Sequence, residues 1–182
     1  LNGVDYTEMT KQWQDTLLRR AQNFLEKILI PISQLDESWT QNLVITLCAG
    51  NDNVPLASVL DSLRKDININ RVLKNNILIV GANDGIYHDS NDAPNDPDFA
   101  NMQSVSDISG HTGTSFAAPL AAAFLSNLVN EKGITARQAL QAAKIAIASN
   151  SKNEFIEGEA KLVAESIKNG VTGVGIFSSD PF

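Results

Sequence analysis

The chain has few of the residues that build disulfides, metal sites or membrane spans. Its 182 residues include one cysteine, Cys48, so no disulfide can form within the chain. The cysteine and the two histidines do not have the spacing of a zinc site. No apolar run approaches the roughly 20 residues that span a bilayer, and residues 1–10 lack the basic and apolar segments of a signal peptide. We interpret Cys48, which lies in an apolar run, as a buried structural thiol.

Basic charge is also scarce. Lysine and arginine number 14 against 21 aspartates and glutamates, which gives a formal net charge of −7 without any basic cluster. Such a chain is a poor candidate for binding nucleic acid or an anionic membrane surface. A content of 43% hydrophobic and 19% charged residues is typical of one globular domain with a real core. The chain begins with Leu1 rather than Met, so we expect a processed product or a part of a longer protein.

Hydrophobic periodicity predicts the first elements of secondary structure. Apolar residues at three- and four-residue spacing predict a helix that ends or kinks at Pro31. Short apolar runs at 43–49 and 77–80 predict strands buried on both faces, each closed by a glycine. Between these strands we expect a short helix at 57–63. The segment 83–98 is rich in Asp, Asn and Pro, which predicts a surface loop. The helical stripe consists of Met9, Trp13, Leu17, Ala21, Leu25 and Ile28, widened by Leu18, Phe24 and Leu29.

The second half of the chain is predicted to be helical. Residues 117–130 are rich in alanine on almost every side, which indicates a helix buried against a sheet, with Gly133 as its C-terminal cap. Thr135 and Gln138 form a capping box for a helix that reaches about residue 148. A last helix is expected at 157–168, before a Gly- and Ser-rich tail at 169–182 that we expect to be poorly ordered. Strands alternating with helices predict an α/β fold of three αβα layers around a mainly parallel sheet.

The strongest chemical signal is Gly-Thr-Ser-Phe-Ala-Ala-Pro at 113–119, directly before the alanine-rich helix. A serine at a helix N-terminus lies among free backbone N–H groups and in the favourable end of the helix dipole. An oxyanion formed when Ser115 attacks a carbonyl would be stabilised by both. Gly113 allows the sharp turn into the helix, and Pro119 falls in or near the first turn. The alternative is an ordinary Ser/Thr cap.

Two further patterns precede this serine. The first apolar run ends in Ala-Gly-Asn at 49–51, which taken alone is a plain turn after a strand. The second run ends in Val-Gly-Ala at 80–82 and carries no chemistry. In this order and with this serine motif, the patterns between residues 43 and 148 resemble the subtilase family of serine proteases. The resemblance implies a subtilisin-like fold, with residues 1–168 as the C-terminal portion of the peptidase domain.

The resemblance also implies an activity. Ser115 matches the family's nucleophile, and Asn51 matches the residue whose side chain donates to the oxyanion. The implied function is a serine endopeptidase acting on peptide or protein substrates, and the family leans towards secreted or extracytoplasmic proteins. The segment between Ala82 and Ser115 lacks the family's Ser-x-x-Gly and Ala-Pro-Gly landmarks, so this part of the substrate cleft does not follow the family pattern.

The triad is incomplete in this sequence. A serine nucleophile needs a histidine base and an aspartate that orients it, and in subtilisins both come earlier in the chain. Neither His88 nor His111 lies in the family's His-Gly-Thr pattern. His111 is four residues from Ser115, which makes it a weak candidate base and more naturally a turn residue or a subsite wall. We therefore expect this chain alone to be inactive, with a missing N-terminal half of the catalytic domain as its partner.

Two alternatives to the protease function remain at this point. One is a non-catalytic binding module that kept the fold, and another is an unrelated α/β ligand-binding domain, in which Asn51 and Ser115 would lie far apart.

Oxygen-bearing side chains at 89–98 could bind Ca²⁺, although the segment lacks the EF-hand pattern and is better explained as a solvated loop, so no cofactor is expected. Half a domain would expose sheet and core, which predicts weak stability or self-association.

Overall fold

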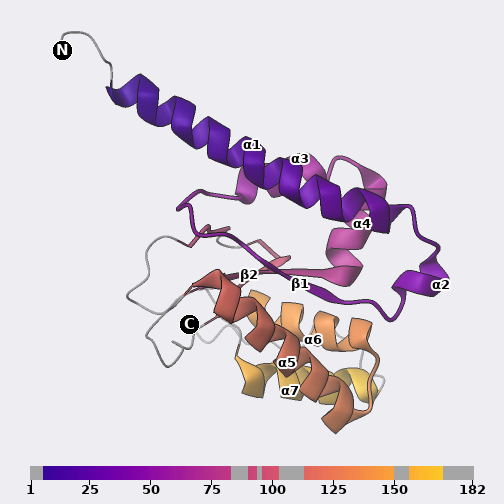
Figure 1. Cartoon of the computed structure of the whole chain (residues 1–182). Helices are drawn as coiled ribbons and strands as arrows, with labels where there is room; N and C mark the ends of the chain where they lie inside the picture. Colours follow the sequence, from indigo (N-terminus) through magenta and orange to yellow (C-terminus); the bar gives the residue numbers. More distant parts are fainter. Residues whose placement is uncertain (1–5, 83–89, 94–95, 103–112, 150–155, 170–182) are drawn as a thin grey trace, which may run out of the picture.

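A computed structural model describes residues 6–82, 90–93, 96–102, 113–149 and 156–169 of the chain (Figure 1). Its described strands form one parallel sheet in the order β1-β2-β3. The strands span Ile45–Cys48 (β1), Ile77–Ala82 (β2) and Phe99–Met102 (β3). Neighbouring strands are in register from Ile45 opposite Ile77 and from Ile79 opposite Phe99.

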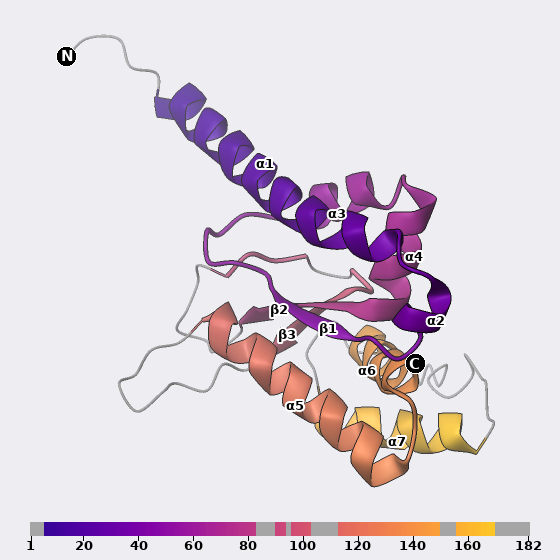
Figure 2. The ribbon, with the colours of Figure 1, turned by 45° about the vertical axis from the view of Figure 1, so that its right-hand side comes forward.

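Helices cover both faces of this sheet, as Figures 1 and 2 show from two directions. One face carries α1 (Tyr6–Ser33), α3 (Ala57–Leu63) and α4 (Ile67–Asn76), and the short α2 (Glu37–Thr40) leads from α1 into β1. The other face carries α5 (Thr114–Lys132), α6 (Ala136–Ala148) and α7 (Glu157–Lys168). The predicted α/β class, with a parallel sheet between helices, is therefore confirmed for the described residues.

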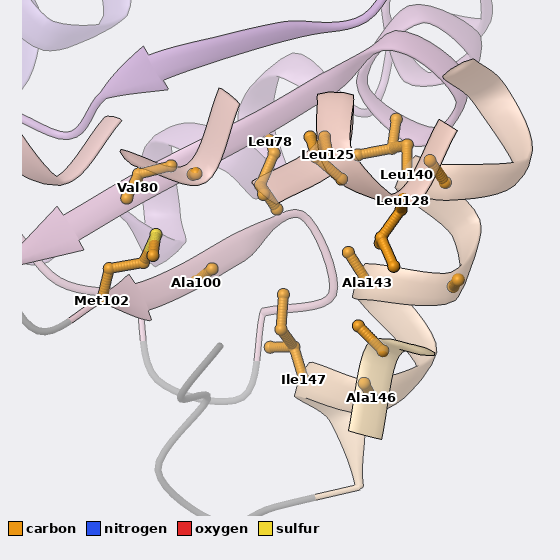
Figure 3. Close-up of a cluster of buried hydrophobic side chains, with 14 of the residues drawn as sticks. Leu78, Val80, Ala100, Met102, Leu125, Leu128, Leu140, Ala143, Ala146 and Ile147 are labelled. Carbon is orange, nitrogen blue, oxygen red and sulfur yellow. The ribbon is translucent and has the colours of Figure 1, made fainter. Parts of the chain in front are cut away.

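The alternation of side chains along β2 explains the two layers of helices. Every residue of β2 is buried, and successive side chains point to opposite faces of a sheet. Ile77 and Ile79 belong to the core shared with α1, α3 and α4. Leu78 and Val80 belong to the core shared with α5, α6 and α7, where Figure 3 shows Leu78 beside Leu125. A continuous apolar run in the middle of the sheet is required because both of its faces are covered.

The prediction that the first apolar run is buried on both faces was wrong. In β1 only Leu47 is buried, Ile45 and Thr46 are half-buried, and Cys48 is exposed. The physical reason is that β1 lies at one edge of the described sheet, whereas β2 lies in its centre. The interpretation of Cys48 as a buried structural thiol is corrected for the same reason.

The first helix is longer and less buried than its periodicity predicts. Helix α1 continues past Pro31 to Ser33 without ending there. Leu17, Leu25 and Leu29 are buried, but Trp13 and Phe24 are 59% and 53% exposed. In Figures 1 and 2 the N-terminal half of α1 extends beyond the other elements, so little packs against its outer turns.

The C-terminal helices begin and end close to the predicted residues. Gly133 caps α5 in the left-handed conformation, and the Thr135–Gln138 capping box opens α6. The bounds of α3 and α7 agree with the predicted ranges. Helix α5 differs in that one of its faces is exposed. Pro119 is its sixth residue, which is near the first turn as predicted. The sequence did not predict α4 or β3, which consist of ten and four residues.

The segment 83–98 is not simply a surface loop, because several of its described residues are buried. Asn91, Asp96 and Asp98 are 2%, 7% and 4% exposed. Asp96 and Asp98 both form ion pairs with Arg64 of the loop after α3. Asp98 forms a second ion pair with Lys144 of α6. Of the helices in the described part of the chain, none combines the length and hydrophobicity needed to cross a bilayer.

Candidate functional site

The turn after β1 and the first residue of α5 contact each other at the carboxyl end of the sheet. Asn51 lies in this turn, and Thr114 opens α5. The Asn51 side-chain oxygen Oδ1 accepts a hydrogen bond from the Thr114 backbone N–H at 3.2 Å and one from the Thr114 hydroxyl at 3.1 Å. The same hydroxyl accepts a hydrogen bond from the Gly50 N–H at 3.3 Å. Three hydrogen bonds therefore join two segments that are more than 60 residues apart in the sequence.

These hydrogen bonds fix the orientation of the Asn51 carboxamide. A backbone N–H can only donate, so the atom facing the Thr114 N–H must be the amide oxygen. The amide nitrogen Nδ2 then occupies the other end of the carboxamide, and among the described residues it has no hydrogen-bond partner. Asn51 is an exposed residue.

Gly113 brings the helix close to this carboxamide. Its φ of +134° lies in the region that side chains rarely adopt, as the predicted sharp turn required. A Cβ at Gly113 would lie 3.4 Å from Asn51 Nδ2. The carbonyl of Gly113 accepts from the N–H groups of Phe116 and Ala117. A glycine at the N-cap position has no side chain that could block the free N–H groups of the first turn.

Ser115 follows Thr114 as the second residue of α5 and is exposed. In the described residues neither its hydroxyl nor its backbone N–H has a hydrogen-bond partner. Pro119 lacks the N–H that would bond to the Ser115 carbonyl in a regular helix. The structure thus brings together both residues expected from the sequence. Asn51 and Ser115 do not lie far apart, since Asn51 is bonded to Thr114, the neighbour of Ser115.

Two residues of the site were not assigned a role from the sequence. Thr114 was noted only as part of the serine motif, yet it is 1% exposed and bonds directly to Asn51. Asn91 was assigned to a solvated loop, yet its side chain bonds to residues on both sides of Asn51. No sequence pattern pointed to Asn91, because its partners are backbone groups about 40 residues away. His88 and His111 lie outside the described residues.

Two aspartates of the acidic segment, Asp96 and Asp98, form ion pairs with cationic side chains of the chain itself. Arg64 binds both oxygens of Asp96, at 2.6 and 2.7 Å, and Oδ2 of Asp98 at 2.6 Å. Lys144 donates to Oδ1 of Asp98 at 2.6 Å. Hydrogen bonds from Arg64 to Asp96 raise the pKa of the Arg64 guanidinium, whereas burial lowers the pKa of Lys144 despite Asp98. Over the described ranges no group of three or more acidic, histidine or cysteine side chains could hold a metal ion.

We compared the chain with models of known protein families, with curated proteins and with solved structures, and it matches none of them.

Proposed function

We propose that this chain is the nucleophile-bearing part of a subtilisin-like serine endopeptidase. The observation that carries the proposal is the pair of hydrogen bonds from Thr114 to the side-chain oxygen of Asn51. Beside the N-terminus of α5, where the second residue is an exposed serine, they hold an amide donor that bonds to no other described residue. Preorganised donors next to a serine are what a developing oxyanion requires.

The chemistry assigned to these residues is acyl transfer. The Ser115 hydroxyl oxygen attacks the carbonyl carbon of a peptide bond, and its proton passes to a base. The oxyanion receives hydrogen bonds from Asn51 Nδ2 and from the Ser115 backbone N–H. The C–N bond then breaks, the leaving amine takes the proton from the base, and water hydrolyses the acyl ester to restore the serine.

The base is the part of the proposal that lies outside the described residues. We assign the histidine and its aspartate to polypeptide outside this sequence, which is the order found in subtilisins. The α/β architecture supports this assignment, because its elements follow one another as they do in that family. Strand β1 is followed by Ala-Gly-Asn, β2 ends in Val-Gly-Ala, and α5 carries the serine. Further strands would then continue the sheet beyond β1.

Labelling with a fluorophosphonate tests the proposal. Attack by an activated serine forms a Ser115–phosphorus bond and expels fluoride, which intact mass and peptide mapping detect. We would label this chain and the longest natural product of its gene, with Ser115→Ala as the negative control. Ser126→Ala is the matched control, since Ser126 is an exposed serine of the same helix.

Each outcome decides between the alternatives. Labelling of Ser115 in the longer protein but not in this chain supports the proposal, with the base outside this sequence. If this chain is labelled when it is tested by itself, the result also supports a serine hydrolase but assigns the base to the chain. His111→Ala then tests the histidine nearest to Ser115 in the sequence. No labelling in either form overturns the proposal and favours a non-catalytic binding module.

A further inference from the structure

Asn91 bonds to the turn that carries Asn51 at four points. Its side-chain oxygen accepts hydrogen bonds from the N–H groups of Asp52 at 3.1 Å and Val54 at 2.9 Å. Its side-chain nitrogen donates to the carbonyl of Ala49 at 2.8 Å. Its backbone N–H donates to the carbonyl of Gly50 at 2.9 Å. The backbone is thus fixed on both sides of Asn51, while the Asn51 side chain remains directed to Thr114.

The fit between Asn91 and this turn is close. Asn91 is only 2% exposed. A Cβ on Gly50 would lie 2.6 Å from the side-chain nitrogen of Asn91, and Gly50 has a φ of +98°, so a residue with a side chain would displace one of the two. Asn91 therefore occupies the space that a side chain at Gly50 would need. Its side-chain amide provides hydrogen-bond partners for backbone groups of the turn.

Asn91 is itself anchored to the sheet. The preceding Ser90 accepts a hydrogen bond from the N–H of Ala82, the last residue of β2, at 3.0 Å. On the other side, the Asp92 N–H donates to the Val54 carbonyl, and the Leu56 N–H donates to the Asp92 carbonyl at 2.7 Å. The segment 90–92 thus links the carboxyl end of β2 to the chain that follows the Asn51 turn.

We propose that Asn91 is a positioning residue that acts through Asn51. It holds the turn so that the Asn51 oxygen remains on Thr114 and the amide nitrogen faces the space beside Ser115. The expected effect of Asn91 on catalysis rests on the proposed function. The positioning of the Asn51 turn by Asn91 does not, because it depends only on contacts within this chain. Buried polar networks of this kind fix one geometry when every member is satisfied.

Asn76 provides a matched control. It is also a buried asparagine, 2% exposed, and its side-chain nitrogen donates to the carbonyls of Thr40 and Leu43 at 2.6 and 2.7 Å. These partners precede β1, at the opposite end of the strand from Asn51. Asn91→Ala and Asn76→Ala both remove buried side-chain hydrogen bonds, but only the first removes them from the Asn51 turn.

The first experiment is NMR of the ¹⁵N-labelled chain. In Asn91→Ala we expect changed shifts for the Asn51 side-chain amide and the Thr114 backbone amide, with exchange of the Thr114 amide hydrogen at least about tenfold faster, because opening of the turn exposes it. Asn76→Ala should leave these signals in place. Unchanged signals in Asn91→Ala, or equal changes in both variants, overturn the inference. If Asn91→Ala does not fold, Asn91→Asp keeps the acceptor oxygen but loses the donor to Ala49, and the same signals should then differ from those of the wild type. Unchanged signals in Asn91→Asp would overturn the inference.

The second experiment uses the active longer protein. Removal of one oxyanion-hole donor costs about 10²–10³ in kcat, a value known from subtilisin itself, which sets the upper limit for a residue acting through Asn51. We expect Asn91→Ala to lower kcat by about 10-fold or more with little change in KM, and to cause no further loss in an Asn51→Ala background. Full additivity overturns the inference. NMR changes without activity in any form would uphold the positioning and reject the proposed function, so the two failures are distinguishable.

Discussion

Asn51 and Thr114 are 63 residues apart in the sequence, yet two hydrogen bonds from Thr114 reach the same side-chain oxygen of Asn51. One donor is a backbone N–H, which only an oxygen can satisfy, and the other is a hydroxyl that also accepts from Gly50. The pairing determines which end of the carboxamide is free.

Replacing the Thr114 hydroxyl should weaken the fold at the site. Thr114→Val keeps the size of the side chain but leaves the Gly50 N–H and the Asn51 oxygen each one partner short. We expect a loss of about 1–3 kcal/mol in the free energy of unfolding, measured by urea denaturation. Thr114→Ser is the control, since it keeps the hydroxyl and should cost about 1 kcal/mol for the lost methyl group. Equal losses in the two variants would show that the hydroxyl contributes nothing.

Two glycine-to-alanine changes should have opposite effects on stability. At Gly50 the positive φ and the 2.6 Å approach to Asn91 oppose a side chain, so Gly50→Ala should lower the free energy of unfolding by roughly 2–3 kcal/mol. At Gly158, in helix α7, nothing lies within 4 Å of an added Cβ. Gly158→Ala should therefore raise stability by roughly 0.5–1 kcal/mol. Thermal or urea unfolding measures both, and a tolerated Gly50→Ala would contradict the described turn.

Lys144 should make stability depend on pH in the alkaline range. Burial lowers its pKa in the folded state below the usual 10.5, so between these two values the unfolded chain binds more protons than the folded chain. The sign of the linkage then requires stability to rise with pH across this window. In Lys144→Met that contribution should disappear. The measurement is urea unfolding at several pH values from 7 to 10, compared between wild type and variant.

The same variant should also be less stable at neutral pH. Lys144 donates to Asp98 and to the carbonyls of Leu73 and Lys74 at the end of α4. Removing one member of a buried ion pair costs about 3–5 kcal/mol when its partner is left uncompensated. Because Arg64 still contacts Asp98 and burial already disfavours the Lys144 ammonium, the expected loss is well below this range, about 1 kcal/mol from the lost hydrogen bonds. Lys161→Met is the control, since its ion pairs with Glu131 and Glu157 lie at the surface and such pairs contribute little.

Tryptophan fluorescence should report on self-association. The chain has two tryptophans, Trp13 and Trp39, which are 59% and 77% exposed. The monomer should therefore emit as water-exposed indole and be quenched readily by acrylamide. If the chain self-associates through its exposed apolar side chains, emission should shift to shorter wavelengths as protein concentration rises. A monodisperse chain with unchanged emission and cooperative unfolding would contradict the prediction of self-association.

The sequence determined much of the fold because several of its signals are local. The Thr135–Gln138 capping box, the glycine after α5 and the apolar run of β2 each specify an element through neighbouring residues alone. Helices α3 and α7 follow from their own periodicity. Strand β3 was missed because its four residues carry no alternation, and they become a strand only by pairing with β2.

For the candidate site, the sequence determined the residue types and the tertiary structure decided their arrangement. The motif around Ser115 and the Ala-Gly-Asn turn were both visible as patterns, since each is a short stretch with local backbone requirements. Cys48 is exposed on the edge strand β1, and Asp98 is buried against Arg64 and Lys144. No local pattern encodes either position. The roles of Thr114 and Asn91 likewise depend on partners far away in the chain. Hydrogen bonds between distant segments exist only after the strands and α5 have packed, so they belong to the tertiary structure alone.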